Sequence, residues 1–267
     1  FIRGDSSLSV MLQPPFASHD SITVNFSYIE DEAGLSTVDI AYTYTTPILG
    51  DYDFDSKITY NDLWDLVENW EMKNFNYELG PVSGEVPHFI SVPDSKFDIE
   101  DGMAFVQIWS WYQKEYGQIV EDTVMIGKPL NIAQLGNELS IFIEDSIVSG
   151  QIQFSNNHID SRLRFSTKSY DGAMYLSHQK PEKGYSILEF ARPKIMAKDT
   201  IHVTAEKESK LKIYYKFYGR DKKEIQRGHT SFEYSTIPST LNLYPAYPNP
   251  FNPVTTLQFD IPYLENT

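Results

Sequence analysis

Residues 50–62 read Gly-Asp-Tyr-Asp-Phe-Asp-Ser-Lys-Ile-Thr-Tyr-Asn-Asp, and this stretch decides how the sequence of 267 residues is organised. Four of its side chains are aspartates, and they fall within the twelve residues from Asp51 to Asp62. Carboxylates this close repel one another unless a cation neutralises them. Calcium is a hard cation that takes about six to eight oxygen ligands, and this density of oxygens suits it. The stretch therefore predicts a calcium-binding loop.

The spacing of the oxygens follows that of a twelve-residue loop of the EF-hand type, which uses positions 1, 3, 5, 7, 9 and 12. Position 7 contributes a backbone carbonyl and the others contribute side chains. With Asp51 at position 1, the predicted ligands are Asp51, Asp53, Asp55, the carbonyl of Lys57, Thr59 and Asp62. Ser56 replaces the usual glycine at position 6. A serine reaches the left-handed backbone conformation at a cost of about 1 kcal/mol, so the prediction stands.

The acidic loop has a second copy later in the chain. Matching residues share an offset of 39, and they are Asp55-Ser56-Lys57 with Asp94-Ser95-Lys96, Asp62 with Asp101, Leu66 with Phe105, Val67 with Val106, and Trp70 with Trp109. One shared offset indicates an internal repeat. Apolar residues follow each loop at helical spacing, so each half is predicted to continue into a helix.

The second copy lacks two acidic ligands, because Ile90 and Val92 stand at the offset of 39 from Asp51 and Asp53. A second ion would need a carboxylate from elsewhere, and Glu78 in the long insert is the nearest one. The candidate ligands of this second site are Asp94, the carbonyl of Lys96, Asp98, Asp101 and Glu78. The alternative is a loop held by its own hydrogen bonds.

On these residues the region 49–116 resembles a type I dockerin, in which two calcium loops, each followed by a helix, are related by pseudo-symmetry. Aspartate at position 12, here Asp62, is also a dockerin trait. The resemblance implies a small helical calcium module. Trp70 and Trp109 fall on the apolar stripe of their helices, so we expect them to pack in a core rather than to stack on sugars.

The remaining sequence is predicted to be mainly β structure, because apolar and polar residues alternate in short runs. In 21–46 two such runs flank a polar turn, and the pair resembles the last strands of bacterial Ig-like repeats. In 121–235 alternation returns between turn signals, as in an antiparallel sandwich, and the architecture resembles a cohesin or a carbohydrate module. Its 211–217 run places Tyr215 inside with Ile213 and Phe217, and it leaves Tyr214 and Tyr218 as candidates for stacking on sugars.

The end of the chain is rich in proline. Residues 243–253 read Leu-Tyr-Pro-Ala-Tyr-Pro-Asn-Pro-Phe-Asn-Pro, which excludes a central strand and favours an extended connector. With the strand-like run that follows, this stretch is very similar to the opening of the type A sorting domain of type IX secretion in Bacteroidetes. The resemblance implies export past the outer membrane and recognition by the type IX secretion machinery.

Together these features predict a mainly β multi-domain protein. Its expected regions are a partial Ig-like β region (1–47), a dockerin-like calcium module (48–117), a cohesin-like β-sandwich (118–236), and a linker with the start of a C-terminal sorting domain (237–267).

Charge and motif content narrow the function. The formal charge is −15, from 22 basic and 37 acidic residues, which opposes binding to nucleic acid. The sequence has no cysteine, no H-E-x-x-H pair and no G-x-S-x-G elbow, so we expect no catalysis within these residues.

We therefore expect a non-catalytic, calcium-stabilised protein that is secreted or held at the outer cell surface. It would act as an adhesin, scaffold or filament subunit, and its partners would be other extracellular proteins or copies of itself. Two alternatives remain open: a carbohydrate-binding accessory region of a larger secreted hydrolase, with polysaccharide as the partner, and a dockerin that docks onto a separate cohesin.

Overall fold

The computed structural model describes residues 15–28, 33–36, 38–121, 124–135, 138–156, 162–167, 172–192, 199–205, 209–234, 242–243, 245, 256–257 and 259–260. The chain divides into two compact units, Phe1–Gly117 and Gln118–Thr267. Each unit has buried apolar residues of its own.

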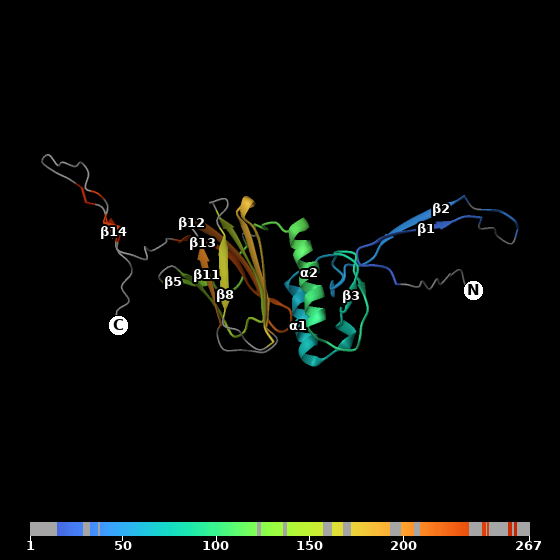
Figure 1. The fold of residues 1–267 in the computed structure, drawn as a ribbon, viewed down its shortest axis with the longest axis horizontal. Helices are drawn as coiled ribbons and strands as arrows, with labels where there is room; N and C mark the ends of the chain where they lie inside the picture. Colours follow the sequence, from blue (N-terminus) through green and yellow to red (C-terminus); the bar gives the residue numbers. More distant parts are fainter. Residues whose placement is uncertain are drawn as a thin grey trace. The chain divides into compact units, whose positions relative to one another are not determined.

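The first unit begins with a two-stranded antiparallel sheet of β1 (Ser21–Phe26) and β2 (Ile40–Thr45) (Figure 1). This confirms the predicted strand pair, whereas its likeness to Ig repeats stays a prediction. The base of the sheet is tied together by Thr46, whose hydroxyl accepts the N–H of Asp20 and donates to the carbonyl of Ala17, both at 2.7 Å.

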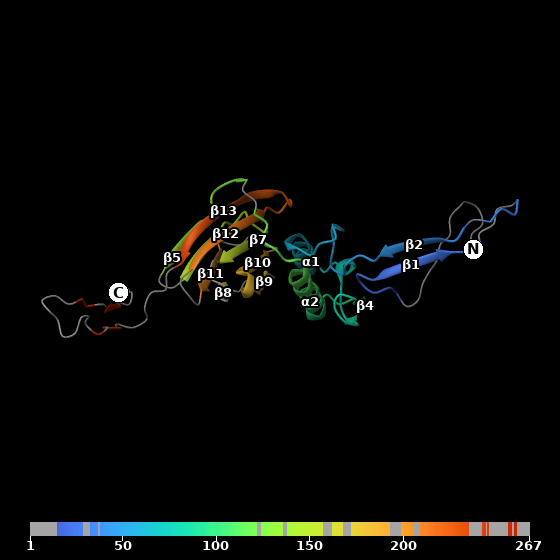
Figure 2. The same cartoon turned by 90° about the horizontal axis from the view of Figure 1, so that it is seen from above.

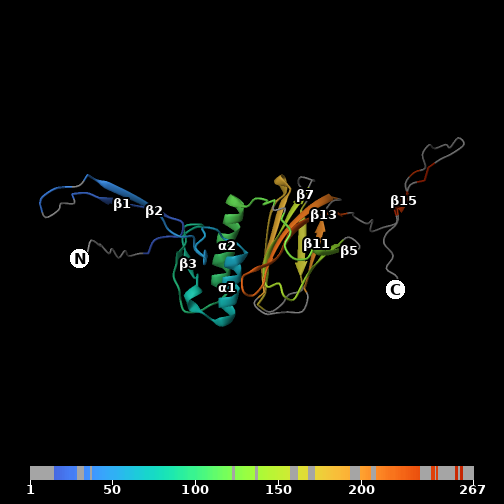
Figure 3. The same cartoon turned by 180° about the vertical axis from the view of Figure 1, so that it is seen from behind.

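Two helices follow, α1 (Tyr60–Met72) and α2 (Ile99–Tyr116), and they lie side by side (Figures 1 and 3). Both helices were predicted from the apolar spacing. Between them lie the short 3-10 turn η1 (Phe75–Tyr77) and a minimal antiparallel pair, β3 (Val82–Ser83) with β4 (Ile90–Ser91). Each helix begins with a capping box, in which the side chains of the N-cap residue and of the residue three positions later bond to each other's backbone N–H.

The core of the first unit consists largely of apolar side chains from α1 and α2. Trp109 is buried, which confirms its predicted core position, and Phe105 of the same helix is buried too. Trp70 is only half-buried, and its ring packs against Phe97 with the centroids 5.4 Å apart. Trp70 and Trp109 are matching residues of the sequence repeat, but Trp109 is buried and Trp70 is only partly buried, so the two halves do not pack in the same way.

The second unit is an antiparallel β-sandwich (Figures 2 and 3). Among the described residues one sheet has five strands in the order β13-β12-β7-β10-β9, and the other has four in the order β5-β6-β11-β8. The strands are β5 (Asn131–Leu135), β6 (Glu138–Ile143), β7 (Ser149–Asn156), β8 (Leu163–Thr167), β9 (Met174–Lys180), β10 (Tyr185–Ala191), β11 (Asp199–Ala205), β12 (Ser209–Tyr218) and β13 (Glu224–Tyr234). A short 3-10 turn, η2 (Pro181–Lys183), joins β9 to β10.

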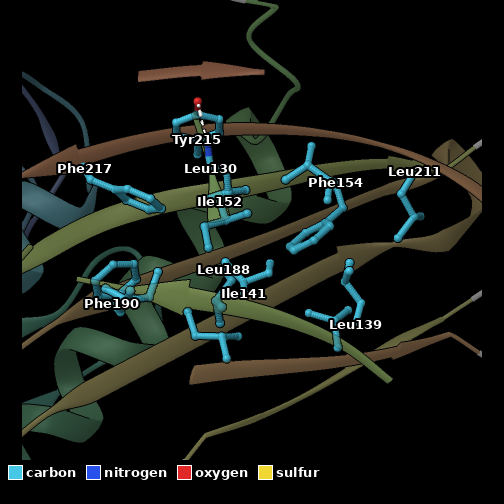
Figure 4. Packing of buried hydrophobic residues seen from close by; sticks show 14 of the residues in the cluster. Leu130, Leu139, Ile141, Ile152, Phe154, Leu188, Phe190, Leu211, Tyr215 and Phe217 are labelled. Carbon is cyan, nitrogen blue, oxygen red and sulfur yellow. Dashed lines mark hydrogen bonds between the residues drawn. The ribbon is translucent and has the colours of Figure 1, made fainter. Parts of the chain in front are cut away.

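The core of the sandwich consists of inward-facing side chains from both sheets, among them Ile141 and Phe154 (Figure 4). The alternation predicted for β12 is confirmed, because Ile213, Tyr215 and Phe217 are all buried in this core. The hydroxyl of Tyr215 accepts the backbone N–H of Leu130 at 3.2 Å, which satisfies its polar end.

The expectation that Tyr214 offers an open face for sugar stacking is wrong. Tyr214 is 7% exposed. The segment before β5 lies along this face of the sheet, as shown by the backbone N–H of Val120, which donates to the side-chain oxygen of Gln153 at 3.0 Å. Tyr218 is half-buried, and its hydroxyl donates to Glu224 at 3.3 Å.

In the tail the structure describes β14 (Asn242–Leu243), which pairs antiparallel with β15 (Phe259–Asp260). Most of the predicted linker and sorting-domain residues in 237–267 lie outside the described residues.

Candidate metal centre

The first acidic loop gathers three of its predicted ligands. One carboxylate oxygen from each of Asp51, Asp53 and Asp55 lies within 4.8 Å of the other two. In the part of the chain that the structure describes, no other three Asp, Glu, His or Cys side chains converge in this way. Asp51 is buried, whereas Asp53 and Asp55 are exposed to solvent.

Backbone hydrogen bonds to these carboxylates set the shape of the loop. The carboxylate of Asp51 accepts the N–H of Asp55 at 3.2 Å and the N–H of Ser56 at 2.9 Å. Asp55 in turn accepts the N–H of Lys57 at 2.8 Å. Ser56 adopts the left-handed conformation expected at position 6, with φ of 64°. The chain therefore turns back on itself around the three carboxylates.

Asp62 closes the loop from the start of α1. Its side chain is fully buried, and its two oxygens accept the N–H groups of Tyr52 and Thr59, each at 2.8 Å. Burial raises the pKa of Asp62 to about 8, and the negative charges of Asp53 and Asp51 act in the same direction. Burial, with the charges of Asp53 and Asp55, also raises the pKa of Asp51.

This donor set fits calcium. It consists of oxygen atoms only, and burial, together with the charges of the neighbouring carboxylates, raises the pKa of Asp51 and of Asp62. A bound divalent cation would offset both effects and favour the ionised forms. The remaining predicted ligands, the carbonyl of Lys57 and the side chain of Thr59, lie at the end of the same loop. The Thr59 hydroxyl accepts the N–H of Asn61 at 3.3 Å as the helix N-cap, so its role toward an ion stays a prediction.

The second loop is built around Glu78, which lies outside the contiguous repeat. One oxygen of Glu78 accepts the N–H of Asp94 at 2.6 Å, and the other accepts the N–H of Ser95 at 3.2 Å. These are the contacts that Asp51 makes with Asp55 and Ser56 in the first loop. Ser95 also repeats the backbone of Ser56, with φ of 64°. Glu78 therefore occupies the structural place of position 1.

The end of the second loop repeats the end of the first. Asp101 is fully buried at the start of α2 and accepts the N–H groups of Leu79 at 2.7 Å, Gly80 at 2.9 Å and Asp98 at 2.7 Å. Gly80 allows this close approach, because a Cβ there would lie 2.7 Å from the carbonyl carbon of Glu100. The segment 78–80 and the segment 94–101 thus form one loop that is interrupted by the excursion carrying β3 and β4.

The two loops differ most at position 3. The first loop has Asp53, whereas Val92, its partner in the sequence repeat, lies beyond β4 and donates its N–H to the carbonyl of Pro81 at 2.8 Å. Asp94 forms an ion pair with Lys96 at 2.5 Å, and this pair lowers the pKa of the Asp94 carboxyl. The predicted residues Glu78, Asp94, Asp98 and Asp101 thus all belong to the second loop. Their carboxylates do not converge on one point as those of Asp51, Asp53 and Asp55 do in the first loop.

In the sandwich, Ser140, His202 and Glu138 lie close together, and these are the residue types of a catalytic triad. Nδ1 of His202 lies 3.5 Å from the hydroxyl of Ser140 and 2.5 Å from the carboxylate of Glu138. A triad needs the serine and the acid on opposite ring nitrogens, so that the histidine can relay a proton between them. Here both contacts fall on the same nitrogen, so this cluster lacks the geometry of a triad.

Comparison with known proteins gives a weak likeness to a solved structure. No protein-family model matches the chain, and no curated protein matches it. Among solved structures it is similar to a cohesin module from the family 33 glycoside hydrolase of Clostridium perfringens ATCC13124, with a TM-score of 0.31 and 14% sequence identity, over 42% of this chain and 98% of that one. A likeness this slight carries no functional argument. The resemblances to a dockerin and to a sorting domain stay predictions.

Proposed function

We propose that this chain is a non-catalytic, calcium-stabilised interaction protein of the cell exterior, and that the loop from Asp51 to Asp62 holds its structural ion. The observation that carries this proposal is the convergence of Asp51, Asp53 and Asp55 beside the buried carboxyl of Asp62. Ionising four neighbouring carboxyl groups costs free energy when no cation is bound, and a bound cation makes the ionised state favourable.

The ion would act on stability rather than on chemistry. Its ligands join the end of the β1-β2 segment to the start of α1, so a bound ion would fix the geometry where the two meet. Because the unfolded chain does not hold these oxygens together, binding favours the folded state by mass action. The gain is about 2.7 kcal/mol when free calcium is a hundredfold above its dissociation constant.

We propose a single such ion. Both loops pair their backbone N–H groups with carboxylates, but no three carboxylates of the second loop converge among the described residues, and Lys96 lies 2.5 Å from Asp94. This favours the alternative raised from the sequence, a loop held by its own hydrogen bonds, over a second calcium site.

Isothermal titration calorimetry with calcium tests the proposal on the full chain. We expect one binding event, which is lost in Asp53→Asn and retained in the matched variant Asp94→Asn. Two events of equal strength, or binding that survives Asp53→Asn and disappears in Asp94→Asn, would overturn the assignment of the ion to the first loop.

The extracellular setting rests on the tail, whose residues 243–253 resemble the opening of a type IX sorting domain. We propose that the chain is exported by that route and binds other extracellular proteins or copies of itself. Fractionation of cells that produce the full chain, with and without residues 243–253, tests the export. Equal amounts outside the cell in both cases would contradict it.

A further inference from the structure

A cavity of about 320 Å³ adjoins the calcium loop within the first unit. Four separate segments line it: the residues just before β1, the end of β2 with the residues after it, the acidic loop, and the C-terminal turn of α2. The residues that matter for a ligand are His19, Thr45, Phe54, Ser56, Tyr112 and Tyr116. A volume near the lower end of known ligand pockets, about 300 to 1,000 Å³, suits a small ligand.

Aromatic rings give this cavity its character. Tyr112 and Tyr116 lie one helical turn apart on α2, with ring centroids 5.1 Å apart. Tyr116 is 52% exposed and Phe54 is 75% exposed, although both are large hydrophobic residues at a cavity. Phe54 also holds a left-handed backbone, with φ of 57°, which places an apolar ring in solvent on a turn. Rings left open beside a cavity offer flat apolar faces to a ligand.

The polar groups of the cavity limit the charge of that ligand. The exposed residues Thr45 and Ser56 provide hydroxyl groups, and His19 provides ring nitrogens. Asp51 belongs to the lining, and none of the described residues that line the cavity is a lysine or an arginine. An anionic ligand would therefore be repelled. A cationic ligand would compete with calcium for the Asp51 carboxylate. A neutral ligand with both apolar faces and hydroxyl groups matches what remains.

We propose that this cavity binds a neutral saccharide of one or two pyranose rings, with Phe54 or Tyr116 stacked against a sugar face. The wall formed by Asp51, Phe54 and Ser56 is part of the acidic loop, so binding would depend on the calcium that holds this loop. This dependence rests on the proposed function, whereas the saccharide site itself rests on the cavity.

The test uses the full chain and four neutral disaccharides, cellobiose, maltose, xylobiose and mannobiose, measured by saturation-transfer NMR and calorimetry in calcium and in chelator. We expect at least one of them to bind in calcium. Phe54→Ala and Tyr116→Ala are both measured, and the variant that removes the stacking ring should weaken that binding about tenfold or more, because the ring face would be buried against the sugar. Phe75→Ala removes another half-exposed aromatic ring outside this cavity and should leave the affinity unchanged.

Each failure points to a different conclusion. If no disaccharide binds, or if binding is indifferent to both cavity variants, the saccharide site is wrong. If tetramethylammonium or an amidated lysine peptide binds in its place, the ligand class is wrong. If a disaccharide binds equally in calcium and in chelator, only the coupling fails. A calcium titration without sugar reports separately on the ion itself.

Discussion

The two acidic loops of the first unit reach the same backbone arrangement from different sequences. In the first loop Asp51 accepts the N–H groups at the turn from four and five residues away. In the second loop Glu78 accepts the equivalent N–H groups across 16 and 17 residues, with an excursion in between. The fold therefore requires a carboxylate at one place in space, and it does not require that carboxylate at a fixed place in the sequence. What the second loop lacks is the convergence of three carboxylates on which the proposed calcium site of the first loop rests.

The largest expected effect lies at the closing aspartates. Asp101→Ala leaves two buried N–H groups and one partly buried N–H group without their acceptor, and we expect it to lower the free energy of unfolding by about 3 to 5 kcal/mol. Asp62→Ala removes two such contacts and should cost less in chelator. Urea unfolding in chelator measures both variants. A smaller loss for Asp101→Ala than for Asp62→Ala would contradict the argument that the number of accepted N–H groups sets the cost.

Replacing the position-1 carboxylates separates the loops by their dependence on calcium. Glu78→Ala should lower stability by a similar amount, about 2 to 3 kcal/mol, in calcium and in chelator, because it removes the acceptor of three backbone N–H groups whether or not calcium is present. Asp51→Ala should in addition abolish the gain from calcium, about 2.7 kcal/mol at a hundredfold excess over the dissociation constant. Thermal unfolding of Glu78→Ala and Asp51→Ala, each in calcium and in chelator, tests this difference. If Glu78→Ala removes the calcium gain instead, the ion belongs to the second loop.

The first loop should also make the stability of the calcium-free protein depend on pH. Burial raises the pKa of Asp62 from 3.8 to about 8, so the folded state binds this proton more tightly than the unfolded state. Its contribution is complete below the unfolded pKa and is lost as pH rises through about 8. Calcium competes with the same proton, so calcium affinity should rise over that range.

Thermal unfolding in chelator from about pH 5 to about pH 9 measures this trend. We expect the melting temperature to fall as pH rises, and Asp62→Asn to flatten the slope because the substituted side chain does not titrate. A melting temperature that rises with pH in the chelated wild type, and does so less in Asp62→Asn, would contradict the raised pKa.

Much of this arrangement could be predicted from the sequence, because it depends on local patterns. The spacing from Asp51 to Asp62 predicts the first loop, and the apolar stripes predict both helices. The offset of 39 places Ile90 and Val92 where the second loop would need acidic ligands, and Glu78 is the nearest carboxylate that could replace one of them. In the sandwich, alternation places Tyr215 correctly, since a strand presents every second residue to the core.

The sequence predicts less well where a side chain depends on a segment far away. Tyr214 is placed outside by alternation, yet the segment containing Val120 lies along that face. Trp70 fits the helical stripe, but its partner is Phe97, which belongs to the second loop. The cavity bounded by Thr45, Phe54 and Tyr116 joins three elements, and no single local pattern predicts their meeting.

The smallest expected effect concerns Lys96. Its ammonium group pairs with Asp94 in the second loop, and Lys57 pairs with Asp55 at 3.6 Å in the first. Both lysines are well exposed, so Lys96→Ala should leave the melting temperature in chelator within error. If Lys96 stands where a cation would otherwise help to hold Asp94, the variant should show weak additional calcium binding by calorimetry. The matched variant Lys57→Ala should strengthen binding at the existing site without adding another. A second event in Lys57→Ala, or none in Lys96→Ala, would mean that the missing counterpart of Asp53 alone keeps the second loop free of calcium.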